Sequence, residues 1–77
     1  MHTTKIKVQY KSGSLAKSAK VTLIIDGIFS GGHTKPVYTD SSGMAFIDHS
    51  SKGNATVYVN GKNCGKMRVP GQNVVFI

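Results

Sequence analysis

Apolar and polar residues alternate with period two over several short runs of this chain, and no run repeats with the 3.6-residue period of a helix. The first such run, residues 5–10, predicts a half-buried strand, because successive side chains of a strand point to opposite faces. The second, residues 20–26, is the most β-prone part of the chain and predicts a central strand. The side chains that we expect to face inward in these runs are Ile6, Val8, Tyr10, Val21, Leu23 and Ile25. Residues 11–19 predict a turn and a short extended connector, with Leu15 tucked beneath it.

A turn is predicted between two further β-forming runs in residues 37–47. Asp40 suits the first turn position because its carboxylate can accept from a backbone N–H two residues on, and Gly43 suits a position with positive φ. This pattern predicts a β-hairpin. Pro36 lies just before the first run, so we expect that run to be an edge strand or a strand start.

A second hairpin is predicted at Asn60-Gly61, which separates two apolar runs and suits a type I′ turn. A strict two-residue register would turn lysines toward the core on the second strand. A bulge at Gly65 adds one residue and returns Met67 and Val69 to the inner face, so we expect a bulge there.

With residues 74–77 as the last strand, these signals predict seven short strands in one domain, residues 1–77. The predicted fold class is therefore all-β, a seven-stranded antiparallel β-sandwich of two packed sheets. A chain this short buries only about 60% of its unfolded surface, so modest stability is expected. The expected core is Ile6, Val8, Val21, Leu23, Ile25, Val37, Ile47, Val57, Val59, Met67 and Val69.

Three segments carry a family resemblance: residues 19–23 (Ala-Lys-Val-Thr-Leu), 38–45 (Tyr-Thr-Asp-Ser-Ser-Gly-Met-Ala) and 55–61 (Ala-Thr-Val-Tyr-Val-Asn-Gly). Together they resemble the carboxypeptidase regulatory-like, or transthyretin-like, group of immunoglobulin-like sandwiches. The resemblance implies an Ig-like (transthyretin/prealbumin-like) sandwich and an accessory module that binds or spaces and does no chemistry. Its pattern also places Ala45 and Ile47 inward in preference to Met44 and Phe46.

One transthyretin-like branch hydrolyses a purine-degradation intermediate and ends in Tyr-Arg-Gly-Ser. This chain ends in Asn-Val-Val-Phe-Ile, so no catalytic residue is carried across. Asp48-His49-Ser50 has the residue types of a hydrolytic triad, but neighbouring strand residues point to opposite faces and cannot form a relay. His2, His33 and His49 lack the short spacing of a metal site, so we expect no metal, no cofactor and no enzyme activity.

The chain is strongly basic, with 10 Lys and Arg against 3 Asp and Glu and a formal charge of +7. Such a charge affects solubility and the binding of anionic partners, and it does not indicate the fold. The lone Cys64 has no internal disulfide partner. We expect neither a membrane span nor a signal peptide in these residues. Attachment to an exported protein would place the domain outside the cell or in its envelope, and otherwise we expect it in the cytoplasm.

Two function classes follow from these observations. The favoured one is a binding or structural module that contacts a protein or glycan through a sheet edge or through the loop at residues 27–34, whose candidate contact residues are Ile28, Phe29 and His33. The alternative is weak, non-specific nucleic-acid binding by interleaved tyrosines and the basic residues Lys5, Lys7, Lys66 and Arg68. In either class we expect a monomer or a weak homodimer formed through a sheet edge.

Overall fold

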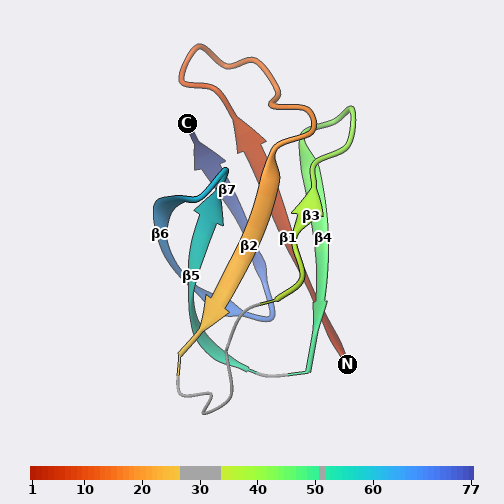
Figure 1. Ribbon diagram of the computed structural model, residues 1–77, viewed down its shortest axis with the longest axis vertical. Helices are drawn as coiled ribbons and strands as arrows, with labels where there is room; N and C mark the ends of the chain where they lie inside the picture. Colours follow the sequence, from red (N-terminus) through yellow and green to blue (C-terminus); the bar gives the residue numbers. More distant parts are fainter. Residues whose placement is uncertain (27–33, 51) are drawn as a thin grey trace.

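The computed structural model describes residues 1–26, 34–50 and 52–77, and these residues form strands and turns without a helix. The strands are β1 (His2–Gln9), β2 (Lys20–Ile25), β3 (Val37–Tyr38), β4 (Met44–His49), β5 (Gly53–Val59), β6 (Lys62–Val69) and β7 (Gln72–Phe76). They form a three-stranded sheet in the order β4-β1-β7 and a four-stranded sheet in the order β3-β2-β5-β6 (Figure 1). The predicted all-β architecture with two sheets is confirmed for the described part of the chain.

The inner faces of the two sheets share one hydrophobic core, because alternate residues of each strand turn toward the other sheet. The buried apolar residues are Ile6, Val8, Ala16, Ala19, Val21, Leu23, Ile25, Ala45, Ile47, Ala55, Val57, Val59, Val69 and Val75. Every predicted core residue is among them except Val37 and Met67, which are partly buried and pack against the cluster. Ala45 and Ile47 face inward as predicted, and Phe46 faces solvent.

The prediction of a wholly antiparallel fold is wrong at one strand pair. β7 runs parallel to β1, and the two arrows point the same way in Figure 1. The chain enters β7 through Gly71, whose carbonyl accepts a hydrogen bond from Lys5 N–H over 2.9 Å in the middle of β1. From there β7 pairs with the second half of β1, from Lys5 beside Gln72 to Gln9 beside Phe76, so the two strands run in the same direction.

The predicted turn at residues 40–43 forms, but the predicted hairpin does not. The Asp40 carboxylate accepts from Ser42 N–H over 2.8 Å and from Met44 N–H over 3.1 Å. The strands on either side belong to different sheets, since β3 pairs with β2 whereas β4 pairs with β1. The turn therefore carries the chain from one sheet to the other. β3 follows Pro36 directly and is an edge strand, as predicted.

The second hairpin is confirmed. Asn60 and Gly61 have φ of 53° and 81°, as a type I′ turn requires. The register shifts by one residue opposite Val57, where β6 has a bulge that includes Gly65 with φ of 107°. Beyond the bulge Val69 is buried as predicted.

Two smaller predictions for the first connector are wrong. Tyr10 is 46% exposed, because β1 ends at Gln9 and Tyr10 N–H bonds to Ser14 O in the following turn. Leu15 is 38% exposed, and the neighbouring Ala16 is fully buried beneath the connector. Ala16 N–H bonds to Val8 O over 3.0 Å, so the connector runs close to β1 at this point, with Ala16 and not Leu15 turned inward.

We predict that Leu23→Ala lowers the free energy of unfolding by about 2 to 4 kcal/mol, because a fully buried aliphatic side chain loses transfer energy and leaves a cavity. Ile24→Ala is the matched control, since Ile24 is only half-buried on the outer face of the same strand. Urea denaturation measures both changes. An equal loss for the two variants would contradict the assignment of faces.

We predict that Gly43→Ala is more destabilising than Gly61→Ala. Both glycines have positive φ, which an alanine adopts only with strain of about 1 to 2 kcal/mol. A Cβ at Gly43 would in addition lie 2.8 Å from the carbonyl oxygen of Val8, whereas a Cβ at Gly61 would meet nothing within 4 Å. Thermal melts of the two variants measure the difference, and equal melting temperatures would show that this close approach carries no cost.

Candidate functional site

The outer face of the three-stranded sheet combines exposed apolar side chains with lysines. Phe46 on β4 and Val74 and Phe76 on β7 are 49%, 47% and 56% exposed, and these two strands flank β1. This outer face carries Thr3, Lys5, Lys7 and Gln9 on β1, Met44, Phe46 and Asp48 on β4, and Gln72, Val74 and Phe76 on β7.

The strand register arranges these side chains in columns. Lys5 lies opposite Phe46 on one side, and Lys7 lies between Met44 and Val74. Neighbouring strands are about 4.8 Å apart, so the two apolar columns are separated by about 10 Å with the lysine column between them. Phe76 extends the apolar column of β7 and lies beside Gln9.

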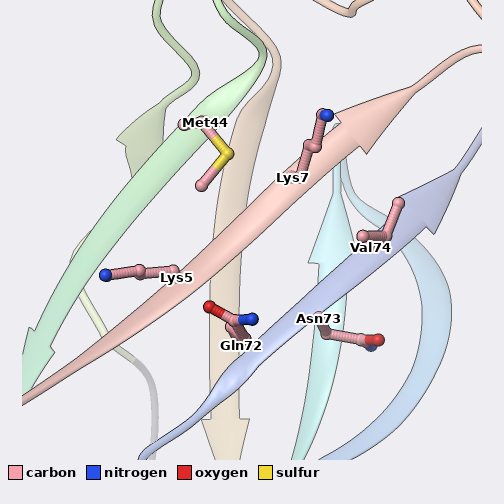
Figure 2. Close-up of a pocket in the computed structure, with 6 residues that line it drawn as sticks. All are labelled: Lys5, Lys7, Met44, Gln72, Asn73 and Val74. Atoms are coloured by element: carbon pink, nitrogen blue, oxygen red, sulfur yellow. The ribbon is translucent and has the colours of Figure 1, made fainter.

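A shallow hollow of about 360 Å³ opens on this face. Figure 2 shows Lys5 and Lys7 on β1, Met44 on β4 and Val74 on β7 around it, with Gln72 and Asn73 at its rim. The hollow therefore has an apolar lining with two ammonium groups beside it. It can accept a side chain from another molecule.

Lys5 and Lys7 have no carboxylate within ion-pair distance among the described residues. Among the described residues, an ion pair forms on the other sheet, where Lys66 Nζ lies 3.7 Å from Asp26 Oδ2. Both of its side chains are at least half exposed, so it contributes little stability. The lysines of the outer face are thus available to an anionic partner.

The sequence-predicted basic residues do not form one surface. Lys66 and Arg68 lie on β6 opposite Thr56 and Asn54, on the solvent side of the four-stranded sheet. Lys5 and Lys7 lie on the solvent side of the other sheet, across the core. The other predicted contact residues, Ile28, Phe29 and His33, lie outside the described residues.

A polar cluster lies at the start of β1 and the end of β4, which are neighbours in the sheet. Thr4 Oγ1 and His49 Nε2 share a buried hydrogen bond of 2.6 Å, and the ring of His2 lies 6.0 Å from that of His49. Asp48 turns to the opposite, exposed face and accepts from Thr3 Oγ1 over 2.7 Å. The predicted separation of the Asp48 and His49 side chains is therefore confirmed. No group of three metal-ligating side chains occurs among the residues described.

The pKa of His2 lies below its ordinary value of 6.5, mainly because of desolvation beside β4 and further because of the positive charge of Lys52 and the N-terminus. The unfolded chain then binds the proton more readily, so stability falls as the pH drops below 6.5.

We predict that His2→Gln makes urea midpoints less sensitive to pH between pH 7 and pH 5. An unchanged slope would show that His2 does not contribute.

The residues that sequence reasoning missed are Phe46, Val74 and Phe76. The run 74–77 is apolar throughout, so alternation gives no indication of which half faces out. One signal was present: a strand in a two-layer fold has a single buried face, so a continuous apolar run must expose half of its side chains.

Within the described ranges, no helix is long and apolar enough to cross a membrane. No protein-family model, curated protein or solved structure matches the chain.

Proposed function

We propose that this domain is a non-enzymatic binding module that contacts an acidic partner protein through the outer face of the β4-β1-β7 sheet. The observation that carries the proposal is the in-register grouping of half-exposed Phe46, Val74 and Phe76 around Lys5 and Lys7. Large apolar side chains exposed singly need no explanation, whereas several of them gathered on one sheet face are typical of an interaction site.

The lysine column determines the chemistry of the partner. A partner that covers the apolar columns must also cover the ammonium groups of Lys5 and Lys7, which lie between them. An ammonium removed from water without a counter-charge is strongly unfavourable. The partner surface therefore has to bring carboxylates to the centre and apolar side chains to both sides.

A protein satisfies these requirements better than the other predicted partners do. A neutral glycan offers no charge for the two lysines. A nucleic acid offers phosphates, but it would place Met44 and Val74 against a polar backbone, where their burial gains nothing. Of the three tyrosines in that alternative, Tyr38 and Tyr58 lie on the other sheet with Lys66 and Arg68, and Tyr10 lies in the turn after β1.

We further propose that the domain is a divergent Ig-like sandwich of the carboxypeptidase regulatory-like or transthyretin-like group. The support is the Asp40 to Gly43 turn with its side-chain bonds, and the inward placement of Ala45 and Ile47 that the family pattern requires. An accessory role is in keeping with such a module.

Photocrosslinking in the cells that make the protein tests the proposal. A benzophenone amino acid replaces Phe46 in one variant and Tyr38 in the control, because Tyr38 is 61% exposed on the edge strand of the other sheet. We predict a discrete adduct with an acidic protein from position 46 and none from position 38. Equal adducts from both positions would contradict the assignment of the face.

The purified partner then allows a charge test. The double variant Lys5→Gln/Lys7→Gln should weaken binding by about 2- to 30-fold, since each exposed ion pair contributes roughly 0.2 to 1 kcal/mol. Lys17→Gln/Lys20→Gln removes the same charge elsewhere and should have little effect. An equal loss in both would indicate a net-charge effect and no specific site.

Fluorescence anisotropy with labelled single- and double-stranded oligonucleotides at two salt concentrations tests the alternative. Charge alone gives dissociation constants of about 10⁻⁴ to 10⁻⁶ M that weaken steeply with salt. Sub-micromolar binding at physiological salt that is lost in Lys5→Gln/Lys7→Gln would replace the protein partner by a nucleic acid.

A further inference from the structure

β7 leaves one side of its backbone open. It pairs with β1 on one side and ends the three-stranded sheet on the other. Gly71 O accepts from β1 over 2.9 Å and Ile77 N–H donates to β1 over 2.8 Å, so odd-numbered residues bond to β1. Because alternate residues of a strand bond to the same neighbour, Gln72, Val74 and Phe76 direct their N–H and C=O groups to the free side.

The other edges each carry a feature that opposes strand addition. β3 has two residues and follows Pro36. On β4, the backbone groups of Met44 bond to Asp40 over 3.1 and 2.9 Å. β6 has the bulge at Gly65 and three charged side chains: Lys62, Lys66 and Arg68.

β7 has none of these features. Its sequence, Gln-Asn-Val-Val-Phe, contains no charge, no proline and no glycine. Two of its outward residues, Val74 and Phe76, are half-exposed and apolar. An uncharged apolar edge with open backbone groups is a site at which another strand pairs.

We propose that a second copy of this chain pairs with the free edge of β7 in an antiparallel, two-fold symmetric dimer, which joins two three-stranded sheets into one of six strands. In the favoured register, Val74 lies opposite Val74 of the second copy and Gln72 lies opposite its Phe76. This register places all three outward residues in hydrogen-bonded pairs. A register shifted by one residue sets the backbone groups of the free side against residues whose backbone groups point to β1. A register shifted by two leaves one of the three residues of each copy without a partner.

The charge distribution favours a second copy as the occupant in spite of the net charge of +7. β7 places no like charges opposite each other in the dimer. The nearest lysine, Lys7, lies one strand away beside Val74. The two copies of Lys7 are then separated by three strand spacings, about 14 Å, which exceeds the screening length of about 8 to 10 Å at physiological salt. An acidic strand in the same place would lie two strand spacings from Lys7, about 10 Å, where screening already weakens the attraction.

The dimer leaves the outer face open and doubles its width, so it does not rest on the proposed function. A single pair of short strands buries less area than a standard interface, so weak association is expected. Sedimentation equilibrium should show the mass rising from 8.2 kDa toward twice that value between about 10 µM and 1 mM protein. A monomer throughout that range would overturn the proposal.

Two variants separate edge pairing from stacking of the outer faces. Val74→Lys places like charges at the centre of the pairing and should weaken dimerisation at least about tenfold. Phe46→Lys changes a residue of equal exposure on the far strand of the same sheet and should leave the dimer intact. Loss of the dimer in Phe46→Lys, or its persistence in Val74→Lys, would overturn the proposal.

A backbone readout keeps the test independent of side chains. Val74→Pro removes an N–H that does not bond to β1, so the fold should persist while the dimer is lost. Should circular dichroism show that this variant unfolds, amide exchange in the unmodified chain decides. We expect protection at Val74 and Phe76 that rises with protein concentration and protection at Phe46 that does not. Concentration-independent exchange at all three would overturn the proposal.

Discussion

The crossing of the chain from one sheet to the other at residues 39–43 is the constraint on which the rest of the structure depends. Gly43 approaches β1 so closely that its carbonyl accepts from Val8 N–H over 2.8 Å. On the other side, the buried Thr39 hydroxyl donates to Ala16 O over 2.6 Å and accepts from Ala19 N–H over 2.9 Å. The crossing thus bonds to β1 and to the connector that leads into β2, and the small residues Ala16, Ala19 and Gly43 make room for it.

This crossing decides what the outer face contains. Since it delivers β4 to the side of β1, and β7 takes the opposite side, β1 becomes the central strand of its sheet. The outward residues of β1 are Lys5 and Lys7, so the two lysines come to lie between apolar columns. Had β3 and β4 formed a hairpin in one sheet, Phe46 would lie on the other layer, away from these lysines.

The small size of the domain explains why apolar side chains remain outside. Each sheet has one face against the core, and small aliphatic residues on alternate positions fill that core. Phe46 and Phe76 face solvent on strands whose inner positions are already occupied by Ile47 and Val75. About half of each of these side chains stays exposed, and this is the surface that our proposed function assigns to a partner. β7 combines this exposed surface with an open backbone edge.

The sequence by itself determined most local features: the strands, the inward faces of β1, β2 and β5, the Asp40 turn, the Asn60-Gly61 turn and the bulge at Gly65. These depend on period-two alternation and on turn chemistry, which act over a few residues. Only the tertiary structure decided the neighbours of each strand, including the parallel β1 and β7, the crossing that replaced a hairpin, and the separation of Lys5 and Lys7 from Lys66 and Arg68. Alternation fixes which face a side chain takes but says nothing about which strand lies beside it, because that choice depends on contacts between residues far apart in the chain.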